Sequence, residues 1–223
     1  MENEDKKNSN SLKITLIWDS GVGKTCIIRR FTTNEFDSNS FATDGVSYCK
    51  KEITYEDKTI QLDLWDTAGQ EQYRSLGKHF YKDSFIVILV YNITVKESFD
   101  NLKNVWLDDI TNFGEEYKVL AIVGNKCDLY EQEAVPEIEA RNFAEKHNAI
   151  FMNVSAKNGT NIEELFSACI KKYFDSDFQV NIKEVKKRDE DSIVIKNKKK
   201  KNNKNKEKKK NGCCWVKLVK YYF

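Results

Sequence analysis

Residues 20–25, SGVGKT, have the types and spacing of a loop that binds phosphate. Backbone N–H groups at the start of a helix attract anions, because they have no partner inside the helix and the helix dipole is positive there. Lys24 can add a positive charge beside the β- and γ-phosphates of a nucleotide, and Thr25 can offer its hydroxyl to Mg²⁺. The alternative is a glycine-rich turn without a ligand.

A second polar segment, WDTAGQE at 65–71, ends another apolar run. Asp66 suits a magnesium carboxylate, acting directly or through a water. Gly69 can present a backbone N–H to a γ-phosphate, since glycine permits close approach. Gln70 can both donate and accept hydrogen bonds, which suits the orientation of an attacking water. The alternative here is a polar turn after a strand.

A third segment, GNKCDL at 124–129, contains a carboxylate that suits recognition of a base. Asp128 can accept two hydrogen bonds from neighbouring donors, which guanine presents at N1 and N2 and adenine does not. A site built around such an acceptor rejects a base without the donors by roughly 10⁴-fold or more. SAK at 155–157 follows a later apolar run and is a weak signal by itself.

Each of these segments follows a run that predicts a β-strand. The strand-like runs are 12–18, 46–55, 58–66, 85–93, 118–125 and 149–156. Helical spacing follows SGVGKT and recurs at 97–113, 137–147 and 160–174. This alternation predicts an α/β fold: a six-stranded, mostly parallel sheet with one antiparallel edge hairpin and helices on both faces. In such a sheet ligands bind at the carboxyl ends of the strands, where the polar segments fall.

Charge divides the 223-residue chain into an acidic body and a basic tail. Residues 196–223 hold 12 lysines and one acid, and the rest holds 25 of the 37 basic and 34 of the 35 acidic residues. The division indicates a tail that seeks an anionic surface, or else a solvated tail without a role. We expect a polar lead at 1–11, a domain at 12–175 and a disordered tail at 176–223. We expect neither a secretory signal nor a membrane span.

The six cysteines form two groups. Four are scattered without metal-ligand spacing and are expected to be reduced thiols of a cytosolic protein: Cys26, Cys49, Cys127 and Cys169. Cys213 and Cys214 are adjacent to each other inside the basic tail.

The order of the four polar segments resembles the small GTPases of the Ras superfamily, from Leu12 to Phe174. WDTAGQE, VYNIT followed by ESF, and the paired cysteines in the tail are most similar to the Rab branch. The resemblance implies a P-loop GTPase domain that binds GTP and GDP with Mg²⁺ and hydrolyses GTP slowly. It also implies a switch that orders residues about 36–48 and 68–82 while the γ-phosphate is present.

The resemblance assigns roles to individual residues. It implies catalytic roles for Lys24, Thr43 and Gln70, and magnesium contacts for Thr25, Thr43 and Asp66. It implies these nucleotide contacts: Ser20, Gly21, Val22, Gly23, Lys24, Thr25, Cys26, Phe36, Thr43, Gly69, Asn125, Lys126, Asp128, Leu129, Ser155, Ala156 and Lys157. Tyr48, Trp65 and Phe80 fall where Rab proteins expose aromatic rings to effectors, and the alternative for these three is ordinary packing.

The resemblance also implies partners and a location. It implies an exchange factor, effectors and a GTPase-activating protein that supplies an arginine, an effect of about 10³ to 10⁵ in rate. An escort protein of the GDI type is a further candidate. We expect a monomer that binds no nucleic acid and regulates vesicle traffic. It would cycle between the cytosol and the cytoplasmic side of an endomembrane, using the Lys-rich tail on anionic lipid.

Trp18 departs from the family pattern G-x-x-x-x-G-K-[ST], because it stands at the first glycine. Strain from such a side chain costs about 1–3 kcal/mol, or roughly tenfold to a hundredfold in affinity. We expect nucleotide binding to be weakened but present. The alternative function is a pseudo-GTPase, a binding module with impaired nucleotide binding or hydrolysis.

Switch I and the tail also depart from the pattern. TDGVSY stands where the family has TIGVDF, so Asp44 and Ser47 predict an unusual choice of effector, and QEQY lacks the usual arginine. Nine residues follow Cys213 and Cys214, and no C-a-a-X box is present. The cysteines are palmitoylated beside the lysine run, or they are prenylated in a mature protein that lacks 215–223, or they are not lipidated.

Overall fold

The computed structural model describes residues 11–17, 19–38, 46–67, 83–106 and 117–175. The chain divides into two units, Met1–Phe174 and Asp175–Phe223, and the architecture that follows is that of the first.

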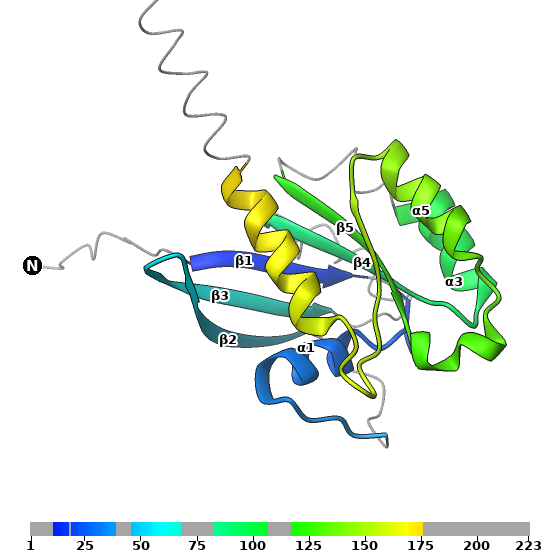
Figure 1. The fold of residues 1–223 in the computed structure, drawn as a ribbon, viewed down its shortest axis with the longest axis horizontal. Helices are drawn as coiled ribbons and strands as arrows, with labels where there is room; N and C mark the ends of the chain where they lie inside the picture. Colours follow the sequence, from blue (N-terminus) through cyan, green and yellow to red (C-terminus); the bar gives the residue numbers. More distant parts are fainter. Residues whose placement is uncertain (1–10, 18, 39–45, 68–82, 107–116, 176–223) are drawn as a thin grey trace, which may run out of the picture. The chain divides into compact units, whose positions relative to one another are not determined.

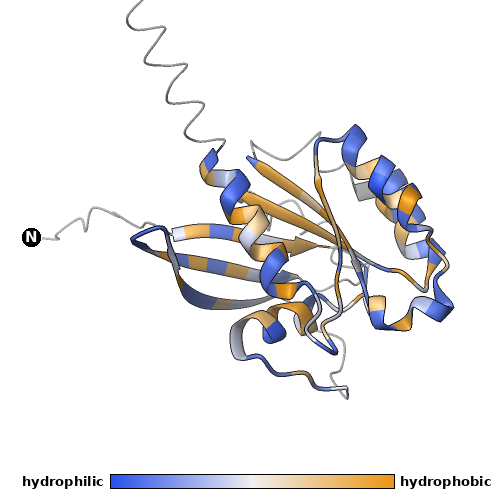
Figure 2. Cartoon of the chain, in the orientation of Figure 1, coloured by the Kyte–Doolittle hydropathy of each residue, from blue (hydrophilic) through white to orange (hydrophobic). Residues whose placement is uncertain are grey.

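Six strands form one sheet in the order β2-β3-β1-β4-β5-β6. Their bounds are β1 Ser11–Ile17, β2 Val46–Tyr55, β3 Lys58–Thr67, β4 Ile86–Asn92, β5 Val119–Asn125 and β6 Ile150–Asn153. Only the edge pair β2 and β3 is antiparallel. Every residue of β4 and β5 is buried, as expected for strands covered on both faces, and Figure 2 colours both strands as hydrophobic.

The β2–β3 hairpin closes through a two-residue turn. Tyr55 pairs with Lys58, which leaves Glu56 and Asp57 in the turn. Glu56 has a φ of 44°, the left-handed conformation that short hairpin turns require. The predicted antiparallel edge hairpin is therefore present.

The four α-helices of the described region pack in two pairs around the sheet (Figure 1). They are α1 (Lys24–Thr33), α3 (Lys96–Asn101), α5 (Glu137–Lys146) and a last helix over residues 162–175. Phe31 of α1 stacks on Phe166 of the last helix with ring centroids 3.7 Å apart. Phe99 of α3 meets Phe143 of α5 edge to face at 5.7 Å.

Two local features differ from the sequence predictions. The helix expected over 97–113 is described as α3 followed by a π-helical turn, η2 (Leu102–Trp106), and its remainder lies outside the described residues. The segment Cys127–Gln132 forms a 3₁₀ helix, η3, which the sequence analysis did not predict. Periodicity over five or six residues is too short a record to separate these helix types.

The predicted α/β fold with a six-stranded, mostly parallel sheet is confirmed. Because β3, β1, β4, β5 and β6 run parallel, their carboxyl ends lie at one edge of the sheet. β1 is bounded by β3 on one side and β4 on the other, so the loop after β1 starts where the strand order reverses. Ligands of open α/β sheets bind at this position.

Candidate functional site

The loop between β1 and α1 has the backbone that a phosphate-binding loop needs. Gly21 and Gly23 have φ values of 77° and 97°, a conformation that costs glycine little. Gly23 is the N-cap of α1, so the first amides of the helix face the loop. A β-carbon at Gly23 would collide with the side-chain amide of Asn125. Glycine is therefore required here both for conformation and for space.

Lys24 is the buried cation of this loop, with 5% of its surface exposed. Its Nζ donates a hydrogen bond to the carbonyl oxygen of Asp19 at 3.0 Å. Burial lowers the pKa of Lys24 to about 8, and the charges of Asp66 and Asp19 partly oppose this effect. The ammonium group thus lies where an anion would relieve the cost of its burial.

Thr25, in the first turn of α1, lies beside Asp66, near the carboxyl end of β3. The Thr25 hydroxyl donates to Oδ2 of Asp66 at 2.6 Å, and Asp66 is buried. Hydroxyl and carboxylate oxygens are ligands that Mg²⁺ accepts, usually together with waters and phosphate oxygens. Within the described ranges no group of three His, Cys, Asp or Glu side chains could hold a metal. The pair thus supplies two oxygen atoms of the kind that Mg²⁺ accepts.

Asn125 joins the phosphate loop to the loop that follows β6. Its Nδ2 donates to the carbonyl oxygen of Val22 at 2.8 Å. Its Oδ1 accepts from the backbone N–H of Ala156 at 3.2 Å. Because Asn125 is buried, these bonds are shielded from water and fix the separation of the two loops.

Asp128 lies at the other end of the site, in the first turn of η3. The Ser155 hydroxyl donates to its Oδ1 at 2.6 Å, and Lys157 Nζ lies 3.9 Å from its Oδ2. Lys126, whose φ is 67°, turns the chain before Asp128 and donates from Nζ to the carbonyl oxygen of Gly21 at 2.9 Å. The Asp128 carboxylate is thus held in one orientation beside the cavity.

Most of these residues line one cavity of about 390 Å³, but Asp66 is not part of its lining. Predicted contacts among its lining are Ser20, Gly21, Gly23, Lys24, Thr25, Cys26, Phe36, Asn125, Lys126, Asp128, Leu129, Ala156 and Lys157. Val22 and Ser155 are buried behind this lining, where they hold Asn125 and Asp128. The segments after β1, β5 and β6 thus meet at one cavity.

The sequence analysis missed three lining residues: Asp37, Ser38 and Thr67. Thr67 is buried and donates from Oγ1 to the carbonyl oxygen of Leu16 at 2.9 Å, and its place directly after Asp66 was an available signal. Asp37 and Ser38 fall inside the predicted switch at about 36–48, but nothing in that segment marked these two residues as nucleotide contacts.

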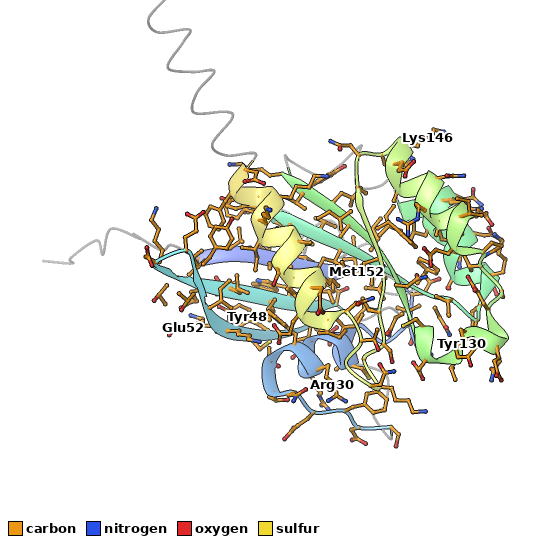
Figure 3. All side chains as sticks on the ribbon, viewed as in Figure 1. Arg30, Tyr48, Glu52, Tyr130, Lys146 and Met152 are labelled. Carbon is orange, nitrogen blue, oxygen red and sulfur yellow. The ribbon has the colours of Figure 1, made fainter. Side chains whose placement is uncertain are left out.

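Two of the three predicted effector residues lie together on the β2–β3 hairpin. The rings of Tyr48 and Trp65 are 5.1 Å apart and tilted by 55°. Tyr48 is 44% exposed on β2 (Figure 3), and its hydroxyl donates to Oδ1 of Asp63 at 2.8 Å. Tyr48 is therefore exposed on the hairpin and Trp65 is half-buried beside it, and their role in effector binding stays a prediction.

Several predicted site residues lie outside the described residues. They are Trp18, Thr43, Gly69, Gln70, Phe80, Cys213 and Cys214. The same holds for the lead at 1–10, for the tail from 176, and for most of the two predicted switches. Cys49, Cys127 and Cys169, all inside the described part, are free thiols. No helix in the described ranges has both the length and the apolar character to cross a membrane.

The fold and the cavity together define a P-loop nucleotide-binding protein. A family model described as the Ras family matches residues 13–175. Ras-related protein Rab-22A of Homo sapiens is 43% identical over 155 residues, which are 70% of this chain and 79% of that protein. Ras-related protein RABA4d of Arabidopsis thaliana is 41% identical over 154 residues, which are 69% of each chain. Ras-related protein Rab11A of Lotus japonicus is 39% identical over 158 residues, 71% of this chain and 70% of that protein.

The chain belongs to the Ras family and is most like its Rab proteins. It is a small GTPase, and proteins of this family bind guanine nucleotide, generally with Mg²⁺. The resemblance inferred from the sequence is confirmed.

Proposed function

We propose that this chain is a Rab-like molecular switch that slowly hydrolyses GTP and regulates vesicle-mediated membrane traffic. The observation that supports this most is the presence of Lys24 and Asp128 in the lining of one cavity. A cation suited to phosphates and an acceptor suited to guanine are thereby available to one ligand.

Phosphate would bind at the amides of residues 21–25 and at Lys24, which neutralises charge on the β- and γ-phosphates. Thr25, Asp66 and Thr43 would hold Mg²⁺, which supplies charge neutralisation at the phosphate oxygens. Gln70 would orient the attacking water. The hydrogen bond of 2.6 Å between Thr25 and Asp66 supports the magnesium assignment, because it brings two of these oxygen ligands together.

The base would bind between Phe36 and the segments after β5 and β6. Asp128 accepts the N1 and N2 protons of guanine, while Ser155 and Lys157 hold its carboxylate in position. The exposed Tyr48 and the half-buried Trp65 beside it would contact effectors, with Phe80 as the third ring. Exchange factors, activating proteins and an escort protein of the GDI type are the other proposed partners.

Trp18 is the residue to change first in testing this function. We expect the wild-type protein to bind GDP and GTP in the micromolar range or tighter, and Trp18→Gly to bind roughly tenfold to a hundredfold more tightly. Contacts of the loop after residue 18 support retained binding, since Asp19 accepts from Lys24 at 3.0 Å and from Asn101 Nδ2 at 2.9 Å. Calorimetry measures the affinities, and a single-turnover assay measures hydrolysis.

The two candidate functions separate in that assay. If the wild type and Trp18→Gly hydrolyse GTP at similar rates, the tryptophan is tolerated and the switch function stands. If only Trp18→Gly hydrolyses GTP, the chain is a pseudo-GTPase binding module. A wild type without micromolar affinity for either nucleotide contradicts the proposed switch.

We propose that the tail anchors the protein to a membrane through lipid and charge together. Residues 196–210 hold ten lysines, and Cys213 and Cys214 follow directly after Gly212. One acyl chain binds membranes only marginally, whereas a chain beside a polybasic segment suffices for stable anchoring. Mass spectrometry of the protein from its own cells is expected to find lipid on Cys213 or Cys214. An unmodified peptide would argue against lipid anchoring.

A further inference from the structure

Arg30 makes an unusual set of hydrogen bonds for an arginine on a helix surface. It lies in the last turn of α1 (Figure 3). Its Nε donates to the carbonyl oxygen of Ala156 at 2.9 Å, and Nη2 donates to that of Lys157 at 2.7 Å. Its Nη1 donates to both the carbonyl oxygen and Oδ1 of Asn34, at 2.7 and 3.2 Å. All three nitrogens of the planar group are therefore used, as only arginine permits.

The first two bonds hold the segment that positions the base acceptor. Ala156 and Lys157 line the cavity, and the neighbouring Ser155 donates to Asp128. The N–H of Ala156 donates to Asn125, which in turn donates to the carbonyl oxygen of Val22 in the phosphate loop. Since α1 begins at that loop, the bonds lead from Arg30 through Ala156 and Asn125 to Val22, and α1 itself connects that loop back to Arg30.

The bonds to Asn34 hold the first residue after α1. Asn34 is the C-cap, with a left-handed φ of 57°, and its N–H donates to the carbonyl oxygen of Arg30 at 3.1 Å. A left-handed residue other than glycine is disfavoured unless local bonds stabilise it. This turn directs the chain to Phe36, Asp37 and Ser38, which line the cavity.

We propose that Arg30 is a positioning residue that couples the base-recognition segment 155–157 to residues 34–38 at the start of switch I. It thereby sets how long a guanine nucleotide stays bound and how well guanine is distinguished. The proposal rests on the guanine-nucleotide function proposed above. Arg30 holds segment 155–157 and Asn34 at the same time. Loss of its bonds to either segment would therefore weaken the hold on the base.

The test uses the full-length protein and two variants of Arg30. Release of fluorescent mant-GDP is expected to be about tenfold faster in Arg30→Met, because charge-assisted bonds to two segments are lost. Arg30→Lys is expected to fall between, since one ammonium group cannot reach all of these acceptors. Arg29→Met is the matched control, because Arg29 is its exposed neighbour on the same helix, and its release rate should stay within twofold of wild type.

A second measurement separates positioning from general loosening. The affinities for GDP and for inosine diphosphate, which lacks the 2-amino group read by Asp128, are compared in each variant. If Arg30 positions the base acceptor, the preference for GDP over inosine diphosphate falls several-fold in both Arg30 variants. If both affinities fall equally along with the melting temperature, Arg30 is only structural and the proposal is wrong. Unchanged release in Arg30→Met also overturns it.

The result distinguishes this proposal from the function on which it rests. Wild type that binds mant-GDP while the Arg30 variants behave like wild type refutes the coupling and leaves the switch function intact. Wild type that binds neither diphosphate refutes both. Arg30→Lys keeps the charge on α1, so it serves as the test variant if Arg30→Met does not fold.

Discussion

Asp128→Asn is expected to lower the affinity for GDP by about 10³- to 10⁴-fold and to raise the affinity for xanthosine diphosphate. A carboxylate accepts both the N1 and the N2 protons of guanine. An asparagine presents one acceptor and one donor, so its amide would face the 2-amino group of guanine without an acceptor. Xanthine has a carbonyl oxygen at that position, which the new amide can donate to. The preference between the two bases should therefore reverse.

The contacts of Asp128 with the rest of the protein should change little in this variant, so the effect on affinity reports on the base contact. Ser155 donates to Oδ1 at 2.6 Å, and an asparagine oxygen can accept the same bond. Lys157 at 3.9 Å contributes little to stability, because it is mostly exposed. Competition binding against mant-GDP measures both diphosphates, and Asp57→Asn in the exposed hairpin turn is the control. Unchanged GDP affinity in a folded Asp128→Asn protein would show that the base is not read here.

Lys24→Met is expected to weaken GDP and GTP binding by about 10²- to 10³-fold, which is the cost of breaking a buried charge pair. Lys24 is almost fully buried at the start of α1, and methionine has a similar length without the charge. The loop amides remain in the variant, so the lost affinity reports on the ammonium group and its phosphate contact. The loss should be larger for GTP than for GDP, because Lys24 is proposed to contact both the β- and the γ-phosphate.

Calorimetry with each nucleotide measures this effect, and thermal melts run in parallel. Some loss of stability is expected as well, because Asp66 and Asp19 lose the cation that interacts with their charges. Lys171→Met, an exposed change on the last helix, is the control for loss of a lysine far from the cavity. Wild-type affinity in a folded Lys24→Met protein would exclude the assigned phosphate role.

Much of the fold could be read from the sequence because its strands are strongly apolar. The runs at 85–93 and 118–125 correspond to β4 and β5, each within one residue at either end. The strand after 149 is shorter than expected, since β6 covers only Ile150–Asn153 at the sheet edge. Beyond β6, Ser155 and Ala156 bond to Asp128 and Asn125 at the cavity, so the apolar run continues as a loop and not as a strand.

Part of the candidate site could likewise be predicted from the sequence, and part could not. Glycines, a lysine and carboxylates at fixed spacing after strands indicated the phosphate and base segments, because their chemistry is local. Neither Arg30 nor Asn34 had such a signal. Arg30 looks like any surface cation of a helix, and its partners Ala156 and Lys157 are 126 and 127 positions away.

The sequence by itself therefore determined the class of fold, the family and the kinds of ligand that the cavity suits. Those properties depend on residue type, short spacing and order along the chain. Only the tertiary structure decided how the segments are held together. Asn125 joins Val22 to Ala156, Ser155 orients Asp128, and Arg30 joins α1 to the segment after β6. These bonds form between residues that become neighbours only when the parallel strands bring their carboxyl ends to one edge, so no local pattern can encode them.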